Sequence, residues 1–123
     1  MTLFHILSAD AWEEAWARGE LRPESLRTEG FIHLSGDRQW LRVANARFAG
    51  RADLVLLTIR EDRLASPVRV EPADGDEFPH LYGPLNLDAV VEALPLPCGP
   101  DGRIGIPETL VPWRAYFEGT KGF

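Results

Sequence analysis

The apolar run at residues 54–59 (LVLLTI) constrains the fold most, because a nearly continuous run of this kind predicts a central, buried strand. Two further strand patterns follow, at residues 68–71 and 90–94, and turn residues, not helical patterns, separate these strands. Residues 73–76 (ADGD) are typical of such a turn. The order predicts an α+β fold with a small mixed or mostly antiparallel sheet, and not a doubly wound parallel sheet.

Two more strands are predicted in the first half of the chain, and each carries a histidine. Residues 2–7 (TLFHIL) are short, apolar and rich in aromatic and β-branched side chains. Because side chains alternate along a strand, His5 and Leu7 are expected on one side of it. Residues 31–35 (FIHLS) give the second pattern, with His33 at its centre.

Two helices are predicted near the N-terminus, between these strands. The first covers residues 10–18, with Asp10 as its cap and Gly19 at its end. The second follows Asp37, which we expect to cap it, and Gly50 closes it. Apolar residues spaced by about 3.6 positions indicate the second helix.

A chain of 123 residues, 45% hydrophobic and 26% charged, is the usual size and composition of one globular domain. We expect a single α+β domain over residues 1–96. From residue 97 to 123 proline, glycine and aspartate interrupt the pattern. This part predicts an irregular C-terminal extension that packs on the domain or on a second subunit.

The formal net charge of −6 argues against general nucleic-acid binding or attachment to a membrane surface. No segment approaches the length of apolar sequence that spans a membrane, and the N-terminus has no targeting pattern. The cytoplasm is therefore the expected location. The single cysteine, Cys98, excludes an internal disulfide and a cysteine-rich zinc site.

The three histidines are the best markers of a functional site, because motifs for phosphate loops, dinucleotide folds, zinc proteases and serine hydrolases are absent. His5, His33 and His80 all lie in apolar or aromatic segments. The first two share a local pattern in which a serine, Ser8 or Ser35, follows shortly after the histidine. If the two strands lie side by side, their imidazoles point into one cleft.

The loop around His80 supplies the remaining candidates. Glu77 precedes this histidine, and a nearby carboxylate fixes the tautomer of an imidazole and raises its pKa. Tyr82 and Gly83 follow it in the segment FPHLYGP. We predict His5, His33 and Glu77 as catalytic residues, and the substrate-binding residues as a second set, namely Ser8, Ser35, His80, Tyr82 and Gly83.

Four segments of this chain, RPESLRTEGFIHLS, VANARFAG, DLVLLTI and FPHLYGPL, resemble the small bacterial family known as domain of unknown function 952. The resemblance runs over about residues 4–96, three-quarters of the chain. The combination of these segments at this spacing is specific. The family has no established reaction, so the resemblance implies a fold and no activity.

The order of segments also resembles the ADP-ribosyltransferase fold, and its RNA 2′-phosphotransferase branch in particular. That branch has a first strand with a histidine and a later strand reading His-Leu-Ser, which FHILS and IHLS resemble here. The resemblance implies that His5 and His33 line a pocket for NAD or ADP-ribose, a small nucleotide-like ligand. Glu77 is the nearest in order to the glutamate that orients the nicotinamide ribose. NAD then serves as a substrate, and no resident cofactor is predicted.

Two other classes of function remain open at this point. Three imidazoles and a water molecule can bind zinc, which predicts a metal-dependent hydrolase, although the chain has no closely spaced histidine pair. Alternatively, the protein is a non-catalytic interaction module whose aromatic partner surface is formed by Trp12, Trp16, Trp113 and Phe117. The second alternative predicts self-association, and the sequence alone sets no oligomeric state.

Overall fold

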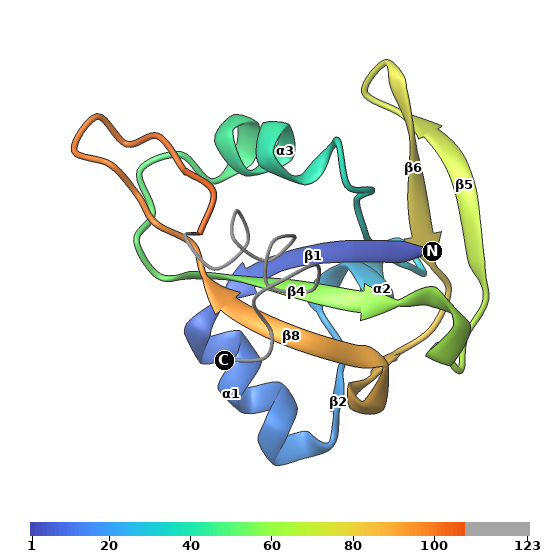
Figure 1. The fold of residues 1–123 in the computed structure, drawn as a ribbon. Coiled ribbons are helices and arrows are strands. Elements are labelled where there is room, and N and C mark those ends of the chain that lie inside the picture. The colour runs from blue at the N-terminus through green and yellow to red at the C-terminus, as the bar shows by residue number, and fades with distance from the viewer. Residues whose placement is uncertain (108–123) are drawn as a thin grey trace, which may run out of the picture.

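The computed structural model of the protein describes residues 1–107. Figure 1 shows the arrangement of helices and strands over this range. In chain order, the elements are β1 (Thr2–Ser8), α1 (Ala9–Arg18), β2 (Glu20–Leu21), α2 (Glu24–Thr28), β3 (Ile32–His33), α3 (Trp40–Arg47), β4 (Leu54–Arg60), η1 (Glu61–Arg63), β5 (Val68–Ala73), β6 (Asp76–Leu81), β7 (Leu85–Asn86), η2 (Leu87–Ala89) and β8 (Val90–Pro95).

The strands form three small antiparallel sheets, with the orders β1-β4-β8, β2-β7 and β3-β6-β5. The predicted α+β class and the antiparallel pairing are confirmed. The prediction of one sheet and two helices was too simple, because the strands form three sheets and α2 is a third helix. With five residues and none of them buried, α2 has no apolar periodicity that would mark it in the sequence.

Strand β4 is the centre of the core, as the apolar run predicted. It pairs with β1 on one side and β8 on the other, and residues 54–59 are all buried. Its side chains alternate between two apolar clusters, so that Leu57 packs with Leu3 and Leu7 while Leu56 packs with Phe4 and Ile6. Figure 1 shows α1 and α3 on opposite faces of this sheet.

Helix α1 begins one residue earlier than predicted, and Ser8 caps it in place of Asp10. The Ser8 hydroxyl accepts a hydrogen bond from the backbone N–H of Ala11 at 3.1 Å, because the strand ends directly at the helix and leaves Ser8 at the cap position. Gly19 ends the helix, as predicted, with φ of 96° and a hydrogen bond to the Ala15 carbonyl. None of the helices within residues 1–107 is both long and apolar enough to cross a membrane.

Helix α3 covers the other face of the sheet, and its predicted cap is also wrong. Gln39, not Asp37, precedes the first helical residue, and it makes no capping hydrogen bond to the helix. Its side chain instead accepts from the N–H of Gly36 at 2.8 Å and donates to the Glu77 carbonyl at 2.7 Å. The start of α3 is therefore fixed by a contact with β6, which no local signal encodes.

Strands β5 and β6 form a hairpin that stands beside the central sheet (Figure 1). Asp74 and Gly75 connect them, with φ of 52° and 78°, the left-handed pair that a tight two-residue hairpin turn requires. The predicted turn at residues 73–76 is thus confirmed. The segment from Phe78, predicted as an ordered loop with a short strand, is mostly part of β6.

Residues 97–107 follow the last strand and contact α3 through hydrogen bonds and apolar packing. Asn45 donates to the Ile104 carbonyl at 2.9 Å and accepts from its N–H at 2.8 Å. Ile104 is buried in the same cluster as Trp40. The remainder of the predicted extension, with Trp113 and Phe117 of the proposed partner surface, lies outside the described residues.

Candidate functional site

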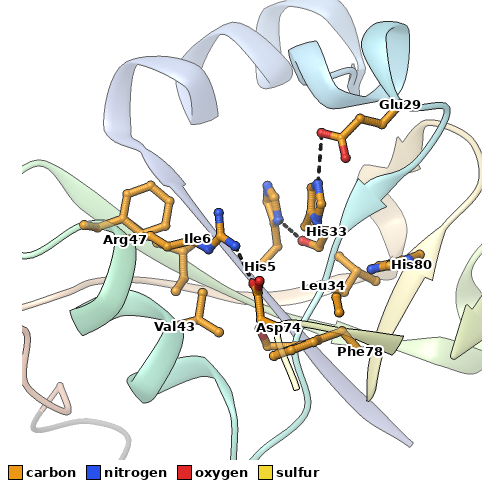
Figure 2. Close-up of a pocket in the computed structure, with 13 residues that line it drawn as sticks. His5, Ile6, Glu29, His33, Leu34, Val43, Arg47, Asp74, Phe78 and His80 are labelled. Atoms are coloured by element: carbon orange, nitrogen blue, oxygen red, sulfur yellow. Dashed lines mark hydrogen bonds and ion pairs between the residues drawn. The ribbon is translucent and has the colours of Figure 1, made fainter. Parts of the chain in front are cut away.

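A cavity of about 450 Å³ lies between β1, the segment after β3, α3 and the β5–β6 hairpin (Figure 2). All three histidines line it, and they come from three different strands, β1, β3 and β6. Most of the other lining side chains are apolar or charged, including Val43, Phe48, Phe78, Glu29, Arg47 and Asp74, and Ser35 adds a hydroxyl. The cavity is within the usual size range of small-molecule sites and combines apolar walls with a few polar groups.

Backbone pairing brings the first two histidines together. Phe4 and Ser35 exchange two hydrogen bonds of 2.8 Å, which hold β1 against the segment that follows β3. The Nδ1–H of His5 then donates to the His33 carbonyl at 2.8 Å. Because Nδ1 faces an acceptor, it carries the proton of the neutral ring, and Nε2 keeps a free electron pair.

The surroundings of His5 keep its ring uncharged. Burial among the strands lowers the pKa of His5 from 6.5 to about 4, partly offset by the hydrogen bond to the His33 carbonyl, while the His33 charge lowers the pKa further. The residue retains some solvent exposure, but its imidazole is desolvated enough that protonation is unfavourable. At neutral pH the ring therefore presents a hydrogen-bond acceptor and no charge.

His33 has a carboxylate partner of its own, Glu29. Its Nε2 lies 3.3 Å from Glu29 Oε2, and the two side chains are half-exposed, at 52% and 49%. Glu29 is positioned by the end of α2, four residues before the histidine. The short helix also bonds back to the strand that follows, because the Ser25 hydroxyl donates to the Phe31 carbonyl at 2.8 Å. This pair forms a polar edge of the cavity (Figure 2).

His80 has a different partner, Glu71 on β5. Its Nδ1 lies 2.8 Å from Glu71 Oε1, which also accepts the Tyr82 hydroxyl at 2.6 Å. The hairpin register explains this arrangement, since Glu71 pairs with Phe78, and residues 78, 80 and 82 alternate onto one side. These hydrogen bonds, first from Tyr82 and then from His80, lower the pKa of the Glu71 carboxyl.

Phe31 packs against the exposed His33 and the buried His80 and restricts the orientation of both rings. Its ring stacks on the His80 imidazole, with centroids 4.0 Å apart and planes inclined by 17°. The same ring meets His33 edge-on at 4.9 Å and Tyr82 at 5.3 Å. One aromatic side chain thus contacts every ring on this side of the cavity.

Ion pairs join α3 to the tip of the hairpin at the other side. Arg47 donates to Asp74 at 2.5 Å, and Arg42 donates to Asp76 at 2.7 Å. The Arg42 guanidinium is the main cause of the lowered pKa of Asp76. Figure 2 shows Arg47 and Asp74 meeting across the cavity from its two walls.

The predicted catalytic glutamate is not among the residues that line the cavity. Glu77 is exposed, and strand alternation directs it to the opposite side of β6 from Phe78 and His80. The carboxylates that do meet histidines are Glu29 and Glu71. The prediction that Glu77 partners the histidines is therefore corrected, because a one-residue offset on a strand reverses the face.

The predicted substrate-binding residues are divided by the structure. Ser35 is buried and lines the cavity, whereas Ser8 caps α1 and lies outside the lining. Tyr82 is not among the lining residues, and its hydroxyl donates to Glu71. Gly83 has a packing role, because a Cβ there would lie 2.1 Å from the Ser66 hydroxyl.

The histidines do not converge on a metal position. Among residues 1–107, no three histidine, cysteine, aspartate or glutamate side chains are arranged to hold an ion. The His33 and His80 rings meet edge-on with centroids 5.5 Å apart. This geometry counts against the three-histidine hydrolase.

Sequence reasoning missed Glu29, Glu71 and Phe31. Glu29 carried a usable signal, because it lies four residues before His33 with a glycine between them. Phe31 is two positions from His33 on the same strand pattern, and so shares its face. Glu71 carried no signal in the sequence, since its contact with His80 depends on the register of the β5–β6 hairpin.

The chain belongs to the family described as "Protein of unknown function (DUF952)", which it matches over residues 6–93. The crystal structure of protein CC0527 from Caulobacter crescentus is 33% identical, with a TM-score of 0.81 over 90% of this chain and 99% of that one. A double mutant of CC0527 matches at 32% identity and a TM-score of 0.81, with the same coverage. The solution NMR structure of CC0527 matches at 34% identity and a TM-score of 0.73, over 88% and 92% of the two chains. No curated protein matches the chain.

Proposed function

We propose that the cavity binds NAD or an ADP-ribose-like nucleotide and that the protein transfers an ADP-ribosyl group. The comparisons give the family and do not support the wider likeness to ADP-ribosyltransferases, so the proposal rests on the cavity. The observation that carries it is the free Nε2 of His5, on a ring held neutral by burial and oriented by the His33 carbonyl.

A neutral acceptor in a cavity selects a ligand that donates a hydrogen bond there. The His5 ring remains uncharged down to about pH 4, so it does not attract an anion at this point. A sugar hydroxyl supplies the donor that Nε2 requires. In this proposal His5 holds a ribose hydroxyl, and the hydroxyl of Ser35, which lines the same cavity, is a second polar contact.

The other walls suit the remaining parts of a nucleotide. Phe48 and Phe78 offer apolar faces for a flat heterocycle. Arg47 lies at the cavity wall and can bind a phosphate if it exchanges its Asp74 partner. His33 contacts the ribose on the nicotinamide side.

The chemistry requires an anion near the reacting sugar. The bond between the ribose C1′ and the nicotinamide nitrogen breaks, its electron pair stays on the nicotinamide, and positive charge develops on the sugar. A carboxylate at this position stabilises that charge. Glu29 lines the cavity beside His33 and takes the role that the sequence had given to Glu77.

Calorimetry with NAD and with ADP-ribose tests the binding directly. We expect heat that fits one site, and its loss in His5→Phe, which keeps an aromatic ring at this position and removes the accepting Nε2. Trp16→Ala is the matched control, because this side chain is 63% exposed on α1 and does not line the cavity. Absence of heat at millimolar ligand, with a folded protein by circular dichroism, contradicts the proposal.

Turnover is measured separately, as nicotinamide released from NAD and resolved by chromatography. We expect release by the wild-type protein and a loss of it in Glu29→Gln with binding retained. The proposal names a small-molecule partner and not nucleic acid, and it keeps the cytoplasmic location expected from the sequence. Binding of NAD without release of nicotinamide would contradict the transferase activity and leave only the nucleotide-binding role.

A further inference from the structure

The Glu71–His80 pair has a feature that neither packing nor the binding role of His5 explains. The His80 Nδ1 faces the Glu71 carboxylate at 2.8 Å, while its Nε2 is buried and has no partner within residues 1–107. His80 is only 4% exposed, yet it borders the cavity. A buried polar atom without a hydrogen bond is costly, and because the His80 ring borders the cavity, a bound group that shifts the lining slightly would supply the missing partner.

We infer that His80 is the general base of this site and that it takes a proton from a hydroxyl group on the acceptor. The inference rests on the proposed ADP-ribosyl transfer and names its second substrate class, an alcohol or water. Figure 2 shows the His80 imidazole among the cavity residues beside Leu34 and His33. Glu71 is a positioning residue, because it acts through His80.

The carboxylate determines which nitrogen exchanges the proton. Hydrogen bonds from Tyr82 and His80 lower the pKa of Glu71, so this carboxyl is ionised at neutral pH. An ionised acceptor keeps the hydrogen on Nδ1, which leaves Nε2 as the basic atom. When Nε2 gains a proton, the imidazolium charge lies next to the Glu71 charge and is stabilised by it.

The ring is also held in place for this role. Phe31 stacks on one face at 4.0 Å, and the His33 ring meets it edge-on at 5.5 Å. Arg69 lies 5.1 Å from the Tyr82 ring centroid and is the nearby cation on this side. A base whose direction is fixed by stacking and by a hydrogen bond loses little freedom in the reaction.

The other two histidines are less suited to accept the proton. His5 is desolvated by burial and donates to an uncharged carbonyl, which stabilises an imidazolium less than a carboxylate does, and its pKa is about 4. His33 faces Glu29 at 3.3 Å through a pair that is half-exposed to water on both sides. Solvent therefore screens the attraction between His33 and Glu29 more than the attraction between the buried His80 and Glu71.

Transfer of the ADP-ribosyl group from NAD to the acceptor hydroxyl conserves atoms and charge without a further reactant. The acceptor O–H bond breaks, its proton moves to His80 Nε2, and the oxygen forms a bond to the ribose C1′. The bond from C1′ to the nicotinamide nitrogen breaks with its electron pair on that nitrogen, which loses its positive charge. His80 then releases the proton to solvent as nicotinamide and the ADP-ribosylated product leave.

Kinetics of nicotinamide release from NAD provide the main test. General-base catalysis contributes about 100-fold or more, so we expect His80→Ala to lower kcat by at least that factor, with KM little changed. Added imidazole restores part of the rate in this variant, which a purely structural role would not predict. Trp16→Ala is the control. A His80→Ala protein with wild-type kcat overturns the inference.

Glu71→Gln keeps the hydrogen bond and removes the charge, so it remains informative if His80→Ala does not fold. We expect kcat to fall about tenfold, less than for the loss of the base itself. An unchanged kcat overturns the positioning role. A long-range ¹H–¹⁵N spectrum is the second measurement, and it should show the Nδ1–H tautomer of His80 in the wild-type protein.

These results separate the inference from the proposed function. A wild-type protein that binds no NAD contradicts the proposed function, whatever the state of His80. In that case the tautomer decides the His80 assignment, since an Nε2–H tautomer overturns it and an Nδ1–H tautomer supports it. Turnover of NAD with normal kcat in both variants contradicts the inference alone.

Discussion

Two of the histidines that line the cavity, His5 on β1 and His80 on β6, have hydrogen-bond acceptors that differ in charge. His5 and His80 each donate from Nδ1 at 2.8 Å, but His5 donates to a backbone carbonyl and His80 to a carboxylate. His80 is the more buried residue by exposed area, so burial alone does not distinguish them. The charge of the acceptor does. The carbonyl only partly offsets the burial of His5, which stays a neutral hydrogen-bond acceptor, whereas His80 faces a charged acceptor.

The largest effect on the free energy of unfolding should come from protonation of His5 at acid pH. Its pKa is 6.5 when unfolded and about 4 when folded, so the unfolded state binds more protons between these values and stability falls as the pH falls from 6.5 to 4. The loss is on the order of 3 kcal/mol. Urea denaturation at several pH values measures it.

The same series on His5→Gln isolates this residue from the acidic side chains that also titrate. We expect the difference in unfolding free energy between the variant and the wild-type protein to change over this pH window. Trp16→Ala should follow the wild-type curve. A His5→Gln curve parallel to the wild-type curve would mean that His5 is not held neutral, and the contrast with His80 would disappear.

Removal of the shared aromatic ring should have the next largest effect. Phe31→Ala leaves a gap against His80, His33 and Tyr82, and we expect a loss of about 2 kcal/mol in unfolding free energy because the ring is only partly buried. Thermal and urea unfolding measure the loss. Phe31→Leu should recover part of it by filling the volume without stacking.

Because Phe31 contacts only the His80 side, this variant also separates the two environments. The His5 signals in a long-range ¹H–¹⁵N spectrum should remain in place while those of His80 move. Equal movement of both would indicate that the two sides are coupled, which contradicts the separation described above.

A smaller effect is expected from Tyr82→Phe. The hydroxyl donates to Glu71 at 2.6 Å and is the main cause of the lowered pKa of that carboxyl, so its removal should raise this pKa. Carbon-detected NMR titration of the Glu71 carboxyl measures the shift. The variant should unfold at a slightly lower temperature than the wild-type protein, and an unchanged Glu71 titration would show that the hydrogen bond has no influence.

The smallest effect is expected at the rim. Arg47 and Asp74 are both exposed, and an exposed ion pair contributes about 0–1 kcal/mol, so Arg47→Ala should hardly change the melting temperature. If Arg47 binds a phosphate, the same variant should weaken ADP-ribose binding in calorimetry. A variant that is clearly less stable, with unchanged binding, would assign Arg47 to structure and not to the ligand.

Patterns that are local in the chain predicted most of the core. The run at residues 54–59 is the central strand, the ADGD segment is the hairpin turn, and Gly19 ends α1. Each of these depends on side-chain character or backbone freedom over a few residues. Helix α2 was missed because it is short and has no apolar periodicity. The cap at Asp10 failed because β1 ends directly at α1 and leaves Ser8 at the cap position, and the cap at Asp37 failed because a contact with β6 fixes the start of α3.

The site was predictable to the extent that it depends on strands. His5 and His33 meet because β1 lies beside the segment after β3, and their shared pattern pointed to this arrangement. Glu71 could not be foreseen, since it reaches His80 only through the β5–β6 register. The choice of Glu77 failed for another reason, because the segment was predicted as a loop, whereas on strand β6 Glu77 and His80 point to opposite faces.

A titration of the ¹⁵N-labelled protein with ADP-ribose at pH 7, followed by long-range ¹H–¹⁵N spectra of the histidines, shows most directly whether the His5 Nε2 accepts a hydrogen bond from the ligand. Before ligand is added, His5 should show a protonated Nδ1 and an unprotonated Nε2. With ligand, the His5 Nε2 signal should move in the direction of hydrogen-bond acceptance and saturate with a single dissociation constant. A His5 signal that starts charged, or that does not respond while the protein remains folded, would contradict the account.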